Sequence, residues 1–369
     1  MEKIQHITVN FDHSQSSILF GDNIFKKIGE IFKNNFPISS KIMIITDDNV
    51  APLYLKNLCN MLNNENFITH YYILPAGEIS KNFKQLQNIL NNIFLHNFLK
   101  SDLIIALGGG VIGDIAAFAA SIAKRGMNFI NIPTSLLAQV DASIGGKTAI
   151  NSEYGKNLIG SFHQPKLVIT DPKLLNSLPN RHLLAGYAEV VKYALISDIN
   201  FFNWLEKNNN YLLQDTIQRK QLILHSIKTK LNIVTKDEKE KNIRALLNFG
   251  HTFAHILEAY YNYDEKIIIH GEAVSLGMLL ALKFSKLLNY ISKEEIDKLT
   301  NHLKIMQLPT SLNEIKGKKI NKDEWWNYLL QDKKNYNNKF KFILLKQLGT
   351  AFIAENIPEN KIKEFFNKL

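Results

Sequence analysis

The chain has 369 residues, 46% hydrophobic and 21% charged, which are the proportions of an ordinary soluble globular protein with room for two domains. Its formal net charge is +10, but only four of the 44 basic residues are arginines and the lysines are scattered. No basic stripe marks a nucleic-acid interface, whereas a small anionic substrate fits the charge. The single cysteine, Cys59, excludes an intramolecular disulfide, and no signal peptide is evident, so we expect a cytoplasmic protein.

The first half of the chain alternates short apolar runs with helical periodicity. Strands are predicted at 41–50, 70–78, 102–109, 129–135 and 166–171, with helices at 51–62 and 82–98. Such alternation predicts a Rossmann-like, mostly parallel sheet with helices on both faces. Ligands in these sheets lie beyond the carboxyl ends of the strands, where "TDDN", "PAGE" and "GGGVIGD" fall.

Residues 103–123 run for 21 positions with one charge, Asp114, and have the length of a membrane helix. Three consecutive glycines disfavour a helix there, and the aspartate would lie in the middle of the bilayer. A strand, a glycine turn and a buried helix explain the run better, and we expect no membrane association.

The pattern of apolar residues changes near residue 180. Residues 183–305 carry long helical patterns with few strand signals. We therefore predict an α/β domain over 1–180 and an all-α domain over 181–369. Within the second, the segment 339–345 fits either a late strand or a buried helix.

The turn "GGGVIG" (108–113) matches the dinucleotide-binding pattern through Gly108, Gly110 and Gly113, with a predicted strand before it and a helix after it. A purely structural tight turn would use the same letters. The later "SIGGKTAI" contains Gly-Lys-Thr, but Asp141 stands where a phosphate-binding P-loop needs its first glycine, so an ATPase is excluded.

Histidines and a glutamate suggest a metal site in the second half. His251 and His255 are about 40° apart around a predicted helix and share one face. Glu189 lies on another helical pattern, and His270 begins a third. Two histidines and a carboxylate form a common open zinc site, although spacing alone does not say which histidines bind.

Long blocks of the sequence resemble the 3-dehydroquinate synthases, members of the sugar-phosphate cyclase superfamily. The blocks are "TDDNV", "AGEISK", "GGGVIGD", "RGMNFINIPTSLLAQVDASIGGKTAIN", "YGKNLIGSFHQP", "AEVVKYALI", "DEKEKNIRALLNFGHTFAHILE" and "HGEAV". The resemblance covers nearly the whole chain. One departure is Ala254, which replaces a usual glycine and puts the local helix packing in question.

The resemblance implies zinc or cobalt bound by Glu189, His251 and His270, with His255 beside the metal as a substrate contact. The residues implied around NAD are Asp47, Asn49, Glu78, Lys81, Gly110, Val111, Ile112, Gly113, Asp114, Thr134, Ser135, Lys147, Lys156, Leu174 and Ser177. The residues implied to act on the substrate are Asp141, Lys147, Asn157, Lys192, Lys230, Arg244, Asn248 and His255. Arg125 would reach the substrate phosphate from the second subunit of a homodimer.

The implied reaction converts 3-deoxy-D-arabino-heptulosonate 7-phosphate to 3-dehydroquinate and phosphate in the shikimate pathway, with NAD recycled. Other sugar-phosphate cyclases and metal-dependent polyol dehydrogenases are the alternatives. Single residues also have purely structural interpretations. Lys192 could be a plain helix ion pair, Lys230 a solvated charge, Lys81 a surface lysine, and Asn248 a helix cap.

Overall fold

The computed structural model describes residues 4–12, 14–209, 212–335 and 340–369. The chain separates into two compact units. The N-terminal unit comprises Met1–Pro179 and Arg219–Glu238, and the C-terminal unit comprises Asn180–Gln218 and Lys239–Leu369. The domain boundary near residue 180 stays a prediction.

A seven-stranded sheet forms the centre of the N-terminal unit. Its spatial order is β1 (Gln5–Asn10), β2 (Gln15–Phe20), β9 (Leu167–Thr170), β6 (Asn128–Pro133), β5 (Leu103–Gly108), β3 (Lys41–Asp47) and β4 (Ile68–Leu74). All neighbours pair in parallel except β1 with β2. The mostly parallel sheet is confirmed, and β1–β2 is a hairpin that the sequence patterns did not predict.

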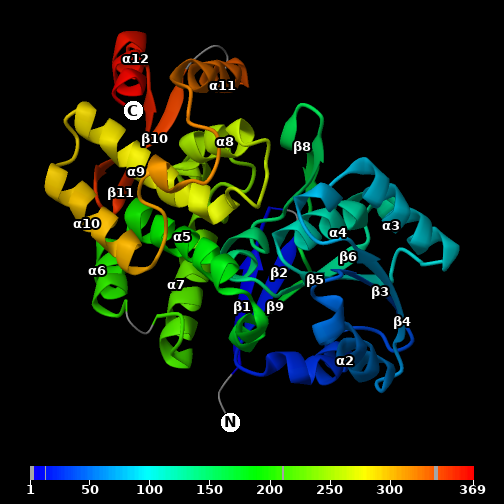
Figure 1. The fold of residues 1–369 in the computed structure, drawn as a ribbon. Helices are drawn as coiled ribbons and strands as arrows, with labels where there is room; N and C mark the ends of the chain where they lie inside the picture. Colours follow the sequence, from blue (N-terminus) through cyan, green and yellow to red (C-terminus); the bar gives the residue numbers. More distant parts are fainter. Residues whose placement is uncertain (1–3, 13, 210–211, 336–339) are drawn as a thin grey trace. The chain divides into compact units, whose positions relative to one another are not determined.

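Alternating side chains of β3 explain why helices cover both faces of the sheet. Met43 and Ile45 are buried in one core with α3 (Phe83–Leu95) and α4 (Gly110–Ile122). Ile42 and Ile44 are buried in the other with α1 (Ile28–Asn35) and α2 (Ala51–Asn63). Figure 1 shows α3 and α4 on the opposite side of the sheet from α2. Side chains two apart in a strand share a face, so one continuous apolar run serves both cores.

Two further elements of this unit carry candidate residues. An antiparallel hairpin, β7 (Lys147–Ser152) and β8 (Gly155–Phe162), follows the π-helical turn Ala138–Ala142. Most of α7 (Thr216–Val234) also belongs to this unit, because its part from Arg219 onward packs here although it lies late in the sequence.

The C-terminal unit is rich in helices, although it is not all-α as predicted. They are α5 (Asn180–Ser197), α6 (Ile199–Lys207), α8 (His251–Tyr260), α9 (His270–Leu287), α10 (Lys293–Ile305), α11 (Lys322–Asn335) and α12 (Glu359–Lys368). One hairpin, β10 (Lys341–Gln347) with β11 (Thr350–Glu355), is added to them. It resolves the open choice at 339–345 in favour of a strand for the residues from 341 onward.

Glycines allow α8 and α9 to approach closely. A Cβ on Gly277 would lie 2.2 Å from the carbonyl oxygen of Gly250, which itself has a φ of +81°. Neither position tolerates a side chain in this geometry. Ala254 is fully buried, and its backbone nitrogen would lie 3.1 Å from that same Gly277 Cβ. Gly277 therefore makes the room that the helix carrying Ala254 needs.

Candidate active site

The residues implied to bind NAD follow the carboxyl ends of parallel strands. Asp47 ends β3, Glu78 follows β4, and the glycine turn follows β5. Thr134 and Ser135 come directly after β6, and the short helix Pro172–Ser177 follows β9. Because these strands run in parallel, their carboxyl ends share one edge of the sheet. That edge is where a parallel sheet positions a ligand.

The glycine turn has the predicted strand–turn–helix form. α4 begins at Gly110 with Gly109 as its N-cap, and Thr134 donates its backbone N–H to the Gly108 carbonyl oxygen at 2.9 Å. A Cβ on Gly108 would lie 2.7 Å from the Cβ of Ile112. A side chain at Gly108 would therefore collide with the first turn of α4, and the N–H groups of a helix's first turn, which lack acceptors within the helix, suit an anion.

Lys81 is not a surface lysine. Only 4% of it is exposed, and its Nζ contacts the Asp114 carboxylate and the Asn157 side-chain oxygen. Burial raises the pKa of Asp114, and the charge of Lys81 partly offsets that rise. The three side chains therefore form a polar cluster at the start of α4.

Asp47 and Ser177 have defined partners of their own. The Oδ1 of Asp47 accepts the backbone N–H groups of Asn49 and Val50, both at 3.0 Å. Burial raises the pKa of Asp47, while these two hydrogen bonds act against the rise. The Ser177 hydroxyl lies 2.6 Å from the Tyr54 hydroxyl, which also donates to the Leu174 carbonyl oxygen.

Candidate substrate residues of this unit fall into buried and exposed groups. Lys230 on α7 is buried and donates to the backbone and carboxylate oxygens of Asp141, at 2.6 and 2.8 Å, so it is not a solvated charge. Lys147 at the start of β7 is exposed. Arg125 is also exposed, in a turn where it and Lys124 both have positive φ. Lys230 is therefore held by Asp141 inside the unit, whereas the side chains of Lys147 and Arg125 reach solvent.

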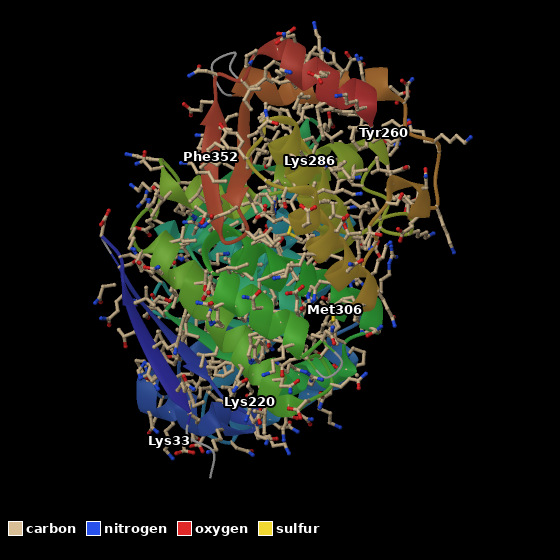
Figure 2. The ribbon with its side chains drawn as sticks, turned by 90° about the vertical axis from the view of Figure 1, so that its left-hand side faces the viewer. Lys33, Lys220, Tyr260, Lys286, Met306 and Phe352 are labelled. Carbon is tan, nitrogen blue, oxygen red and sulfur yellow. The ribbon has the colours of Figure 1, made fainter. Side chains whose placement is uncertain are left out.

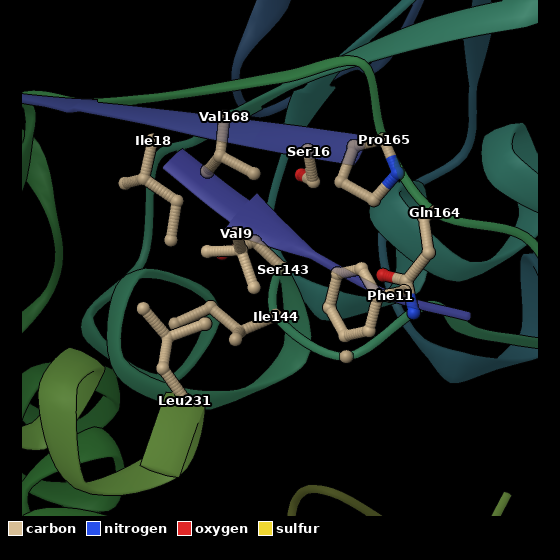
Figure 3. Close-up of a pocket in the computed structure, with 11 residues that line it drawn as sticks. Val9, Phe11, Ser16, Ile18, Ser143, Ile144, Gln164, Pro165, Val168 and Leu231 are labelled. Carbon is tan, nitrogen blue, oxygen red and sulfur yellow. The ribbon is translucent and has the colours of Figure 1, made fainter. Parts of the chain in front are cut away.

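A small cavity lies beside the loop that leads to Lys147. It is lined mostly by apolar side chains, including Val9, Ile18, Ile144 and Leu231, which surround the cavity in Figure 3. Its volume is about 10 Å³. Since that is room for roughly one water molecule, this cavity is not a sugar-phosphate site.

In the C-terminal unit, Glu189, His251 and His270 converge. One ligand atom from each lies within 4.8 Å of the other two. The Nε2 atoms of His251 and His270 are each 3.5 Å from Glu189 Oε1. The helices α5, α8 and α9 each contribute one of the three. His255, one turn after His251, is exposed, and its ring centroid is 5.6 Å from that of His251.

The donor set fits a divalent transition metal. Burial lowers the pKa of His251 to about 3, which leaves the imidazole neutral, the form that ligates metals. Burial also acts to lower the pKa of His270, but Glu258 and Glu189 outweigh it and raise that pKa to about 10. His270 must therefore release a proton when a cation binds, and two imidazoles with one buried carboxylate then suit zinc or cobalt and leave coordination positions open.

Lys192, Arg244 and Asn248 belong to the same unit, and one of them, Lys192, contacts a proposed ligand. Lys192 forms a buried ion pair with Glu189, so the helix ion pair considered from sequence does exist. Arg244 is buried in the short helix Ile243–Asn248. Asn248 donates to Glu240 at 2.7 Å, whereas the N-cap of α8 is Gly250. Asn248 is therefore not the cap of α8.

Two carboxylates near His270 received no role from the sequence. Glu258, on α8, places Oε2 3.5 Å from His270 Nδ1. Glu272, in the first turn of α9, accepts from Arg181 through both oxygens, at 2.7 and 2.8 Å, and from the Ile269 backbone N–H. The signals were available, since Glu258 lies two helical turns after His251 and Glu272 two residues after His270.

Comparison with known proteins places the chain in a family. The family models "3-dehydroquinate synthase N-terminal" and "3-dehydroquinate synthase C-terminal" match residues 71–185 and 186–335. A 3-dehydroquinate synthase of Bartonella bacilliformis is 45% identical over 370 residues, covering 99% of this chain and 98% of the relative. A 3-dehydroquinate synthase of Rhizobium johnstonii is 42% identical over 365 residues, covering 99% and 97%.

The fold is shared with solved cyclases at lower identity. A 2-epi-5-epi-valiolone synthase from Streptomyces hygroscopicus, with NAD+ and Zn2+ bound, superposes with a TM-score of 0.86 at 23% identity, covering 97% of this chain and 98% of the other. The same TM-score and identity are found for a 2-deoxy-scyllo-inosose synthase complexed with carbaglucose-6-phosphate, NAD+ and Co2+, over 99% and 100%. The matches at high identity over the full length decide the family: the chain belongs to the 3-dehydroquinate synthases.

Proposed function

We propose that this chain converts 3-deoxy-D-arabino-heptulosonate 7-phosphate to 3-dehydroquinate and inorganic phosphate, as a phosphate-eliminating carbon–oxygen lyase of the shikimate pathway. The observation that carries the proposal is the convergence of Glu189, His251 and His270 in a chain of this family. The two structural relatives with bound NAD+ and Zn2+ or Co2+ support the same cofactors here.

Glu189, His251 and His270 would hold the metal, and the strand edge with the glycine turn would hold NAD. Bound there, NAD supplies reversible hydride acceptance, and a divalent cation supplies polarisation of the substrate's oxygens. Everything else falls to side chains of this chain, which must bind two anionic groups and orient the reacting carbons.

The cationic residues provide the anion binding. The substrate carries a carboxylate and a phosphate, and guanidinium and ammonium groups form strong, charge-assisted hydrogen bonds with both. We assign this role to Lys147, Lys192, Lys230 and Arg244, with Asn157, Asn248 and His255 as neutral polar contacts. Lys230 already donates to Asp141, so its ammonium is held in place before substrate arrives.

Lys81 and Asp114 of the polar cluster serve the dinucleotide in this proposal, while Asn157, its third member, contacts the substrate. Lys81, buried against Asp114 and Asn157, fixes both of their side chains. A positioned carboxylate at Asp114 would accept a hydrogen bond from a neutral donor of the cofactor, and the N–H groups at the start of α4 would bind its phosphates.

We further propose a homodimer in the cytoplasm, with Arg125 contributed by the second subunit. The exposure of Arg125 in the turn after α4 supports this role. Among the described residues, no helix has both the length and the apolar character needed to cross a membrane.

The proposal is tested by measuring phosphate release from the heptulosonate phosphate with metal-stripped protein. Four reactions are compared: without additions, with NAD, with zinc, and with both. Release only when both are present supports the proposal. Equal release in all four reactions, or none in any, overturns it.

A further inference from the structure

A buried carboxylate lies behind one of the proposed metal ligands. Glu258 on α8 is 3% exposed, and its Oε2 is 3.5 Å from the Nδ1 of His270. The Nε2 of the same ring is 3.5 Å from Glu189 Oε1. The His270 imidazole therefore lies between two carboxylates, one at each ring nitrogen.

The helix explains how Glu258 reaches this position. It lies seven residues after His251, which is two turns on nearly the same face of α8. Helix α8 thus supplies the proposed ligand His251 at its first residue. The same helix supplies the Glu258 carboxylate, which lies beside the proposed ligand His270 at the start of α9. A shift of either helix along the other would separate Glu258 from His270.

His251 has a matching arrangement. Its Nδ1 is 3.2 Å from the Phe249 carbonyl oxygen, and its Nε2 is the atom near Glu189. In both histidines an oxygen atom lies near Nδ1, while Nε2 lies near the Glu189 carboxylate. An oxygen at Nδ1 favours the tautomer with its proton on Nδ1, which leaves the Nε2 lone pair for a cation.

We propose that Glu258 is a positioning residue, which holds the His270 imidazole for metal binding through Nε2 and strengthens its donor character. The proposal rests on the metal site proposed above. A distance of 3.5 Å is long for a hydrogen bond, but the attraction of a buried carboxylate for the ring extends beyond that range. Carboxylates behind metal-bound histidines contribute about 10- to 100-fold to metal affinity.

The burial of Glu258 argues against a packing role alone. An ionised carboxylate inside a protein is costly unless a partner compensates it, and an apolar side chain of similar size fills such a position at lower cost. A buried negative charge next to a metal site, by contrast, is compensated by the bound cation and attracts it.

The test uses the full-length, metal-free protein titrated with Co²⁺, read by the visible absorption of bound cobalt. Glu258→Gln keeps the shape of the side chain and removes its charge, and we expect its Kd for Co²⁺ to rise by about 10- to 100-fold. Glu258→Asp keeps the charge on a shorter side chain and should recover part of that loss. Glu265→Gln is the matched control, because this exposed carboxylate lies five residues before His270. Its Kd should stay within about twofold of the unsubstituted protein's, as is usual for exposed surface positions.

The outcomes separate the two proposals. If the unsubstituted protein binds no Co²⁺, the metal site itself is wrong, and this inference falls with it. If it binds Co²⁺ and Glu258→Gln binds equally well, the site stands and the role of Glu258 is overturned. The role is also overturned if Asp and Gln lose the same affinity while both lower the unfolding temperature of the metal-free protein, since that pattern indicates packing damage.

Discussion

At the scale of single residues, polar side chains that look ordinary in the sequence prove to be buried and paired. Lys81 and Lys230 resemble the other scattered lysines in the sequence, yet each is buried against carboxylate oxygens. Two lysines with more exposed side chains are paired as well. Lys33 and Lys220, labelled in Figure 2, lie 2.9 and 3.1 Å from Glu65 and Asp22.

A buried histidine away from the proposed site should make folding sensitive to acid. His302 is 2% exposed, its Nε2 lies 2.8 Å from the Tyr187 hydroxyl, and burial, aided by the charge of Lys298, lowers its pKa to about 4. Between pH 6.5 and about 4 the unfolded chain binds a proton at this residue that the folded chain does not. The free energy of unfolding therefore falls as the pH falls through this window, by about 3 kcal/mol in all.

Urea unfolding at several pH values checks this expectation. His302→Gln should flatten the pH dependence across that window, whereas His6→Gln, at an exposed position, should leave it unchanged. An unchanged slope in the His302→Gln protein would contradict the prediction.

Lys81 offers a second prediction for a single residue. Lys81→Met keeps the length of the side chain but removes the ammonium that fixes Asp114 and Asn157. NAD affinity should fall by about 10-fold or more, because a buried carboxylate loses its compensating charge. Isothermal titration with NAD measures this, and Lys84→Met, at an exposed site on α3, is the control. Equal affinities for the two variants would rule out the role assigned to Lys81.

At the scale of elements, the close approach of α5 and α9 sets the distance between the proposed metal ligands Glu189 and His270. A Cβ on Gly271 would lie 2.0 Å from the Ala185 carbonyl oxygen on α5, one turn before Glu189. Only glycine lets the first turn of α9, which carries His270, come this close to α5. The ion pair of Arg181 with Glu272 joins the beginnings of the same two helices.

Gly271→Ala should therefore push α9 away from α5. We expect a loss of about 1–3 kcal/mol in the free energy of unfolding, as is usual when a packed contact is overfilled, together with weaker Co²⁺ binding. Gly21→Ala is the control, because a Cβ there would make only ordinary contacts, the nearest at 3.5 Å. If Gly271→Ala is as stable as the control and binds Co²⁺ normally, the close contact does not set the site.

How far the sequence predicts the structure depends on the range of the interaction. Five parallel strands and the helices α2, α3 and α4 of the first unit follow from local periodicity, whereas α1 was not predicted. In the second unit, α9 begins at His270 as its pattern indicates. The β1–β2 and β7–β8 hairpins were missed, because their strands are not bounded by a recognisable turn pair or a long apolar run. The return of α7 to the first unit depends on packing between distant segments, which no local pattern encodes.

The candidate site divides in the same way. Glycine spacing and the His-x₃-His pair predict the right elements, but the choice of His251 over His255 came only from family resemblance. In the structure the choice depends on which imidazole meets Glu189, and that is a tertiary contact. The position of Glu258 beside His270 is also a tertiary contact, because the two residues lie on different helices, and the sequence alone does not predict it.

At the scale of the whole molecule, the proposed homodimer makes a quantitative prediction through Arg125. Arg125→Ala and Lys230→Met should each be nearly inactive alone. If Arg125 acts on the partner's site, each mixed dimer has one fully intact site, so random remixing should restore about a quarter of the activity. Steady-state phosphate release after the subunits are mixed and exchanged measures this. No recovery, with exchange confirmed, would mean that Arg125 serves its own subunit.

The central claim is that the chain eliminates phosphate without net redox change, and the most direct measurement is the ratio of NADH accumulated to phosphate released. The protein is supplied with NAD, zinc and the heptulosonate phosphate, while nicotinamide absorbance and phosphate are followed in the same reaction. A ratio near zero, with 3-dehydroquinate formed in step with phosphate, is the expected result. NADH that accumulates in proportion to the substrate consumed, without phosphate, would contradict it and indicate a dehydrogenase.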